Sequence, residues 1–203
     1  MSVKKIVFAT KNNDKFREIK KFFSDIKDIE WLSFLDFSDF PNVVEDQPTI
    51  EANSRKKAVE ISRFYGIAAL ADDTGLFVDF LDGKPGVFSA RWAGEGSRYI
   101  DNNLKLLDKL KGVDFEKRTA SFKCAVSFAL PDGECITEVG EIRGYILNEM
   151  RGDGGFGYDP LFWVKEKNKT FAQMSIDEKN SISHRAKALL KIKPHILRFC
   201  EGL

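Results

Sequence analysis

The chain has few cysteines and no long apolar segment. No apolar stretch among its 203 residues is long enough for a signal peptide or a membrane span, so we expect neither, and no membrane partner. The three cysteines, Cys124, Cys135 and Cys200, do not have the spacing of metal ligands. A sparse, odd count fits a reducing compartment better than a disulfide framework. We therefore expect a cytoplasmic protein.

The chain also has almost no net charge. Its 32 Lys and Arg are matched by 31 Asp and Glu, which leaves a formal charge of +1. A nucleic-acid-binding surface would be strongly basic, so the composition argues against a nucleic-acid partner. The hydrophobic share of 43% is enough for a full core, and no internal repeat is present. We expect one domain over residues 1–203, with one or two lobes.

A candidate phosphate site lies near the start of the chain. A continuous apolar run predicts a buried strand over Lys4–Thr10, and apolar residues at helical spacing predict a helix that begins a few residues later. The turn between them consists of Thr10, Lys11, Asn12, Asn13, Asp14 and Lys15. A helix N-terminus attracts anions, and the lysine adds a full charge. The turn is either a phosphate cradle without the glycines of a P-loop or an ordinary capped turn with solvated lysines.

A pair of adjacent carboxylates follows the next apolar run. Ile67–Ala71 is predicted to be a parallel strand that ends at Asp72 and Asp73. Ligands of open α/β sheets bind at the carboxyl ends of strands, and paired carboxylates there suit Mg²⁺. Glu45 could supply a further ligand. The alternative is that the two acids only cap a turn into Gly75.

A glycine-rich segment and a short basic segment near the end of the chain have the groups that a nucleobase pocket needs. Gly152–Pro160 contains four glycines around Phe156, whose ring offers a stacking face. Asp159 precedes a proline, so its backbone is biased towards an extended form. Ser183-His184-Arg185 adds a histidine and a planar cation, both able to hydrogen-bond to base or phosphate.

Strand and helix patterns first alternate and then give way to a hairpin. The further expected elements are a helix over Thr49–Tyr65, strands over Trp31–Phe37 and Leu76–Leu81, a helix capped by Ser97, a hairpin of Thr119–Leu130 with Glu134–Arg143, a short strand over Leu161–Val164 and a last helix from Ser181. This order predicts an α/β fold: a mixed twisted β-sheet flanked by helices, with two lobes and the active site in the cleft between them.

Taken in order, these segments resemble the inosine triphosphate pyrophosphatase family, whose members are house-cleaning nucleoside triphosphate pyrophosphatases. The matching segments are Phe8–Thr10, Asn53 with Lys57-Ala58, Ala71–Gly75, Pro85–Arg91, Gly154–Pro160 and Glu178–Arg185. The resemblance implies hydrolysis of ITP, dITP and XTP to the monophosphate and pyrophosphate. It also implies a Mg²⁺ cofactor and a homodimer. Two alternatives stay open, a pyrophosphatase for modified pyrimidine nucleotides and a weakly active nucleotide sensor.

The resemblance also implies roles for single residues. Thr10, Asn12 and Lys15 would hold the triphosphate, and Thr74 would contact the substrate. Glu45 and Asp73 would bind Mg²⁺, with Asp73 also the base for the attacking water, although Asp72 and Asp73 could exchange these two roles. The base and sugar pocket would consist of Phe156, Gly157, Tyr158, Asp159, Lys179, His184 and Arg185. Lys15 would stabilise the departing pyrophosphate.

One position departs from the family pattern. Many bacterial members have a glutamate directly before the asparagine that corresponds to Asn53, where this chain has Ala52. With Thr49 as the N-cap of the expected helix, Ala52 takes the capping-box position. The change removes either a cap contact or a carboxylate near the metal, and the sequence leaves both readings open.

Overall fold

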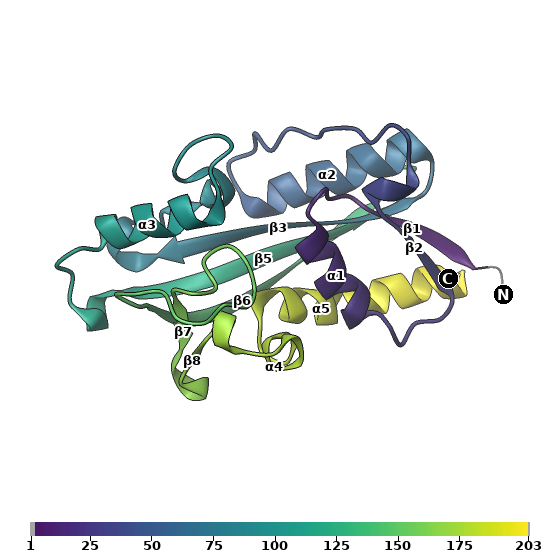
Figure 1. Ribbon diagram of the computed structural model, residues 1–203. Coiled ribbons are helices and arrows are strands. Elements are labelled where there is room, and N and C mark those ends of the chain that lie inside the picture. The colour runs from purple at the N-terminus through teal and green to yellow at the C-terminus, as the bar shows by residue number, and fades with distance from the viewer. Residues whose placement is uncertain (1–2, 203) are drawn as a thin grey trace. The chain divides into compact units, whose positions relative to one another are not determined.

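The structure, a computed structural model, describes residues 3–202 and divides into two compact units. Unit 1 comprises the chain as far as Asp73, Cys124–Gly140, and the chain from Arg185 onward. Unit 2 comprises Thr74–Lys123 and Glu141–His184. Strands β3, β5 and β6 each contribute residues to both units (Figure 1). The expected domain over the whole chain and the expected cleft stay predictions.

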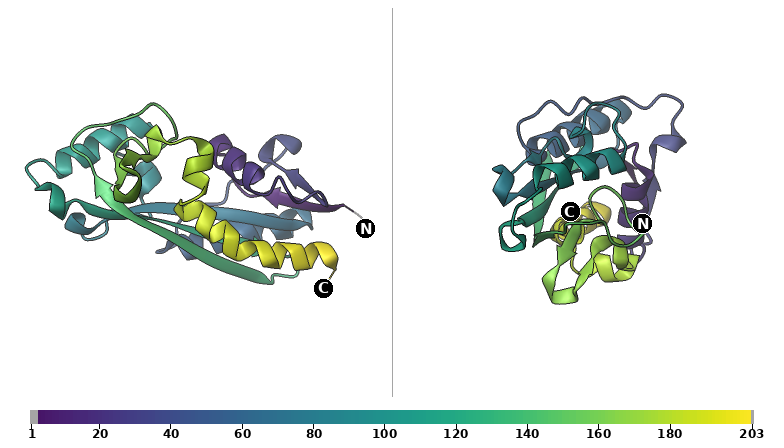
Figure 2. Two further views of the ribbon diagram at one scale, coloured as in Figure 1. Left: turned by 90° about the horizontal axis from the view of Figure 1, so that it is seen from below. Right: turned by 60° about the vertical axis from the view of Figure 1, so that its left-hand side comes forward.

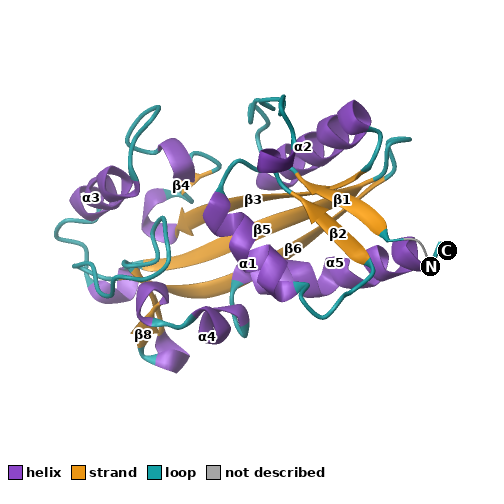
Figure 3. Cartoon of the chain, turned by 45° about the vertical axis from the view of Figure 1, so that its right-hand side comes forward, coloured by secondary structure: helices purple, strands orange, loops and turns teal. Residues whose placement is uncertain are grey.

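The described elements alternate between strands and helices before the hairpin. The strands are β1 (Lys4–Phe8), β2 (Ile29–Leu32), β3 (Ala68–Val78), β4 (Pro85–Gly86), β5 (Thr119–Ala129), β6 (Cys135–Ile146), β7 (Phe162–Val164) and β8 (Lys169–Thr170). The helices are α1 (Asn13–Phe22), α2 (Ile50–Tyr65), α3 (Tyr99–Lys109), α4 (Ile176–Asn180) and α5 (His184–Glu201). Parallel pairing of β1 with β2 and β3, and antiparallel pairing of β6 with β7, make the sheet mixed (Figure 3). The predicted mixed sheet flanked by helices is therefore confirmed.

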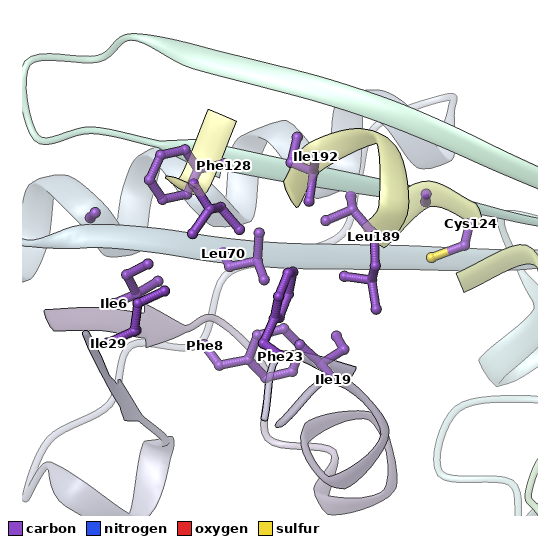
Figure 4. Close-up of a cluster of buried hydrophobic side chains, with 14 residues drawn as sticks. Ile6, Phe8, Ile19, Phe23, Ile29, Leu70, Cys124, Phe128, Leu189 and Ile192 are labelled. Carbon is purple, nitrogen blue, oxygen red and sulfur yellow. The ribbon is translucent and has the colours of Figure 1, made fainter. Parts of the chain in front are cut away.

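Unit 1 has three layers because β1 and β3 bury both of their faces. On β1, Ile6 and Phe8 point into a cluster with α1 and α5, and Val7 points into a second cluster with α2. Figure 4 shows the first cluster, which includes Ile19 of α1, Leu189 of α5 and Leu70 of β3. A strand that is buried on both faces reads as a continuous apolar run, which is why the sequence predicts β1 well.

The beginning of β1 lies next to the end of α5. The ammonium group of Lys4 lies 5.3 Å from the ring centre of Phe199, and both views in Figure 2 show these two segments side by side.

Among residues 3–202, no helix is both long and apolar enough to cross a membrane.

Unit 2 has its own core. In this unit β3 pairs with β4, and β6 pairs with β7, which pairs with β8. Helix α3 packs on the strands through the fully buried Leu106 and its C-cap residue, Leu110, which lie in one cluster with Leu76 of β3 and Phe122 of β5. The cluster also includes Tyr158, so the core of unit 2 extends to the glycine-rich segment.

The structure corrects the prediction that a strand ends at Ala71. β3 runs without a break from Ala68 to Val78, so Asp72 and Asp73 lie inside it. The parallel ladder with β1 stops where Phe8 pairs with Leu70, but β3 continues because its second half pairs with β4. The two acids therefore lie just past the end of β1 rather than past the end of their own strand.

Two helix boundaries also differ. The N-cap of α3 is Arg98 rather than Ser97, and Asp101 accepts hydrogen bonds from the backbone and side chain of Arg98. The expected last helix begins at His184 instead of near Ser181, and a separate short helix, α4, precedes it. The hairpin of β5 and β6 and the end of α2 at Gly66 agree with the predictions.

Candidate active site

The turn between β1 and α1 is a capped helix N-terminus. Asn12 is the N-cap, and its Oδ1 accepts from the backbone amides of Asp14 at 2.9 Å and Lys15 at 3.2 Å. The backbone amide of Asn12 donates to Oγ1 of Thr10 at 3.2 Å. Asn12 therefore occupies two of the amides that a phosphate would otherwise use. An anion would meet the helix dipole and the charge of Lys15 there. Lys11 and Asn13 are exposed on the same turn.

Lys15 points to a fully buried carboxylate. Its Nζ lies 3.2 Å from Oδ2 of Asp72, which is 0% exposed. The same oxygen accepts from Arg185, whose Nε and Nη2 lie 3.2 Å and 3.1 Å away. Although burial works against its charge, the positive groups of Lys15, Arg185 and Lys57 hold the pKa of Asp72 well below its usual range.

Arg185 is a part of this buried network in unit 1. Its Nη1 donates to Glu18 on α1, and its other nitrogens are those that bind Asp72. Burial works against its charge, but Asp72 and Glu18 raise the pKa of Arg185 above its ordinary value. The guanidinium expected in a base and sugar pocket thus binds two carboxylates. Sequence reasoning did not identify Glu18, although it lies three residues after Lys15 and hence on the same face of α1.

A second buried lysine connects the other two acids. Nζ of Lys57 donates to Glu45 and, at 2.7 Å, to the backbone carbonyl of Asp72, and it lies 4.0 Å from Oδ1 of Asp73. Sequence reasoning gave Lys57 no role of its own. A signal was present, because Lys57 lies at helical spacing from Asn53 and Ile61 on the buried face of α2.

Asn53 holds the segment that carries Glu45. Its Oδ1 accepts from the backbone amide of Gln47 at 2.9 Å. The N-cap of α2 is Thr49, whose hydroxyl accepts from the amide of Ala52 at 3.1 Å, as the sequence predicts. Because Ala52 has no carboxylate, the capping box lacks the side-chain hydrogen bond back to the amide of Thr49. The structure is compatible with both readings of this position, a lost cap contact and a lost carboxylate near the metal.

The two adjacent carboxylates differ in their ionisation. Burial raises the pKa of Asp73, and the charges of Lys57 and Lys15 offset this only in part. In contrast, Lys57 and Lys15 overcome the effect of burial at Glu45 and lower its pKa. A raised pKa makes a carboxylate a better base, and a lowered pKa keeps it ionised. Thr74, half-buried, follows Asp73 in β3.

We refer to the seven side chains of unit 1 described above as the charged centre: Lys15, Glu18, Glu45, Lys57, Asp72, Asp73 and Arg185. Within residues 3–202, no three His, Cys, Asp or Glu side chains gather as a complete metal site would require. Mg²⁺ in phosphoryl chemistry usually binds through one or two carboxylates of the protein, together with substrate phosphates and water.

The glycine-rich segment, residues 152–159, forms a tight loop in unit 2. Oδ2 of Asp159 accepts from the backbone amide of Phe156 at 2.9 Å. Gly155 permits this contact, because its φ is +69° and a Cβ there would lie 2.1 Å from the same Oδ2. The side chain of Asp159 thus folds back onto the loop, and Phe156 is half-buried.

Lys179 joins this loop to helix α4. Its Nζ lies 2.6 Å from Oδ2 of Asp159, and both residues are buried. The ammonium also lies 4.8 Å from the ring centre of Phe156 and 5.4 Å from that of Phe171. The predicted set of Phe156, Asp159 and Lys179 is therefore brought together in one cluster.

The remaining predicted pocket residues lie in the core of unit 2. His184 is buried and stacks on Phe122, with ring centres 4.7 Å apart and planes at 12°. The hydroxyl of Tyr158 donates to the carbonyl of Ser89 at 2.9 Å, and burial raises the pKa of this phenol. Both residues belong to unit 2.

The fold and these two clusters define a class: an α/β protein with a buried charged centre and a glycine loop whose phenylalanine ring lies beside a lysine of α4. The chain belongs to the Ham1 family, whose model matches residues 6–195. The resemblance drawn from the sequence is thus confirmed.

Relatives with this fold come from several bacteria. A dITP/XTP pyrophosphatase of Geobacter sulfurreducens is 48% identical over 192 residues, which cover 95% of this chain and 96% of that protein. A dITP/XTP pyrophosphatase of Elusimicrobium minutum is 49% identical over 195 residues, covering 95% and 99%. The structure of a HAM1 protein from Coxiella burnetii matches with a TM-score of 0.86, at 34% identity and with 96% and 99% coverage.

Proposed function

We propose that this protein hydrolyses deaminated purine nucleoside triphosphates, such as dITP and XTP, to the monophosphate and pyrophosphate. The names of the relatives from Geobacter sulfurreducens and Elusimicrobium minutum support this substrate class. The observation that carries the proposal is the contrast between Asp72 and Asp73. One carboxylate is fixed by cations, and its neighbour has a raised pKa. Hydrolysis needs a positioned base of this kind next to groups that neutralise phosphate charge.

The residues of the charged centre divide this work. Asp73 accepts the proton of the attacking water, because its Oδ1 lies 4.0 Å from Lys57, a looser pairing than the ion pairs of 3.2 Å and 3.1 Å that hold Asp72. Lys15, at the N-terminus of α1, stabilises the charge that develops on the departing pyrophosphate. Asp72 is assigned neither task, since its Oδ2 already receives hydrogen bonds or ion pairs from Lys15 and Arg185. Its role is to keep these two cations in place.

The acids of the charged centre fit a Mg²⁺ cofactor. Glu45 and Asp73 both approach Lys57 Nζ, and they are the residues that would hold the ion. Two carboxylates and the oxygens of a triphosphate are the hard ligands that Mg²⁺ prefers. When bound, Mg²⁺ neutralises phosphate charge and lowers the pKa of a bound water. Asp72 is the weaker candidate ligand because its Oδ2 pairs with two cations, Lys15 and Arg185, whereas Glu45 and Asp73 both approach the single ammonium of Lys57.

The glycine loop supplies the base pocket. Phe156 stacks on the purine, and the ammonium of Lys179, which has only donors, lies close to that ring. Hypoxanthine and xanthine present an acceptor at C6, whereas adenine presents an amino donor. A buried donor at this place therefore stabilises hypoxanthine and xanthine. With adenine, the same donor would face the amino group, and neither could accept a hydrogen bond from the other.

We expect a homodimer in the cytoplasm. The family resemblance supports the dimer, and the sparse cysteines support the compartment, since Cys124, Cys135 and Cys200 are all free thiols. Size-exclusion chromatography with light scattering measures the oligomeric state directly.

A comparison of substrates tests the proposed class. We expect kcat/KM for dITP and XTP to exceed that for dATP and for modified pyrimidine triphosphates by at least about a hundredfold, because a mismatched hydrogen-bond edge in a buried site is costly. Equal rates for dATP, or a preference for a pyrimidine, would contradict it. Tight binding of dITP without turnover would instead identify a nucleotide sensor.

A further inference from the structure

A buried asparagine on α3 contacts the glycine loop. Asn103 is 3% exposed, and its Nδ2 donates to the backbone carbonyl of Gly157 at 2.8 Å. Gly157 directly follows Phe156 and has a φ of +63°. The hydrogen bond therefore acts on the peptide next to the proposed stacking ring.

The other half of the Asn103 amide is unsatisfied. Oδ1 is buried and has no hydrogen-bond partner among the described residues. A buried acceptor without a partner destabilises a fold, and an apolar side chain of similar size would avoid that cost. Stability alone thus does not account for an asparagine here. What the residue contributes is the Nδ2 donor to Gly157.

Helix α3 reaches the loop at a second point, one turn earlier. Tyr99 lies four residues before Asn103, and its ring centre is 6.1 Å from that of Phe156. The helix is held in the core of unit 2 by Leu106 and Leu110, which are fully buried. One face of a fixed helix thus contacts both the stacking ring and the peptide that follows it.

The bonds within the loop fix its shape but not its placement. The amide of Phe156 donates to Asp159, and the amide of Asp159 donates to the carbonyl of Phe156 at 3.2 Å. Both bonds lie within the loop. Placement needs contacts with other elements, and Asn103 provides one at the carbonyl of Gly157.

We propose that Asn103 is a positioning residue for the nucleobase: through the carbonyl of Gly157 it fixes the orientation in which Phe156 meets the purine. The inference rests on the proposed function, since it requires that Phe156 stacks on the substrate. It adds a residue on α3 to the base pocket. Asn103 touches no reacting atom and acts only through the loop.

A double-mutant cycle of Asn103→Leu and Phe156→Ala tests the inference, with dITP as substrate. Asn103→Leu is expected to raise KM by about two- to tenfold, the effect of one hydrogen bond, with kcat little changed. Its melting temperature should change little, because the loss of the hydrogen bond to Gly157 is offset by the removal of the unpartnered Oδ1. Phe156→Ala alone should raise KM by about fivefold or more. In the double variant, Asn103→Leu should add nothing, because the ring that it positions is gone.

Leu106→Val is the matched control, because it shortens a buried side chain of the same helix that makes no hydrogen bond to the loop. It should lower the melting temperature and leave KM unchanged. If Asn103→Leu behaves like this control, the residue is only structural and the inference is overturned. An undiminished effect of Asn103→Leu in the Phe156→Ala background also overturns it. An unchanged KM in Phe156→Ala alone overturns the proposed stacking itself, so the two failures are distinguishable.

Discussion

Asp73→Asn is expected to lower kcat by at least about a hundredfold, the low end for losing a general base, while the fold stays native. An amide can neither take the proton of the attacking water nor balance a bound cation. The fold should survive, because burial already disfavours the charge of Asp73, as its raised pKa indicates. An uncharged residue of the same shape removes that cost, so the melting temperature should stay equal or rise. Steady-state kinetics and circular dichroism measure the two effects.

Asp46→Asn is the matched control for this variant. Asp46 is an exposed carboxylate whose ion pair with Lys56 spans 2.8 Å at the surface. Its replacement should change neither kcat nor the melting temperature, because exposed ion pairs contribute little. Turnover at the normal rate in Asp73→Asn would remove this residue from the mechanism.

Asp72→Asn, unlike Asp73→Asn, is expected to cause a large loss of stability. The substitution leaves the buried guanidinium of Arg185 and the ammonium of Lys15 without the carboxylate that balances them. Breaking a buried pair in this way costs about 3–5 kcal/mol. For a protein of this size, that lowers the melting temperature by roughly 6–20 °C. Thermal unfolding followed by circular dichroism gives the value.

The control for this second variant is Asp79→Asn. Asp79 also accepts from an arginine, with 2.7 Å between its Oδ2 and Nη2 of Arg143, but both side chains are exposed. We expect a change of at most about 4 °C, because such a pair is worth at most about 1 kcal/mol. If Asp72→Asn lowers the melting temperature no more than Asp79→Asn, the buried network does not stabilise unit 1 as described.

Local signals in the sequence predicted much of the fold. The N-cap at Asn12 and the end of α2 at Gly66 follow from single residues whose chemistry determines the local backbone. The hairpin of β5 and β6 follows from alternation and the turn after Leu130. The continuity of β3 could not be predicted in this way. A pair of acids normally marks a strand end, and here buried cations from other elements compensate their charges.

For the candidate site too, the sequence predicts only those residues that a local pattern marks. Lys15 and Asp73 can be identified from local patterns, because Lys15 lies in the turn between a predicted strand and helix and Asp73 follows an apolar run. Glu18 and Lys57 could not be identified in this way. Their part in the charged centre depends on partners that lie far away in the chain, such as Arg185 for Glu18. The sequence likewise could not show that Asp72 and Asp73 differ. Their different pKa shifts come from the placement of Lys15, Lys57 and Arg185 around them.

The most direct test of the account is the phosphorus product of dITP hydrolysis, followed by ³¹P NMR during the first turnovers with Mg²⁺ present. The proposed attack between the α- and β-phosphates predicts pyrophosphate and deoxyinosine monophosphate in equal amounts, with no orthophosphate and no deoxyinosine diphosphate. Orthophosphate and the diphosphate as first products would place the attack at the γ-phosphate. That result would contradict the central claim that this chain is a nucleoside triphosphate pyrophosphatase.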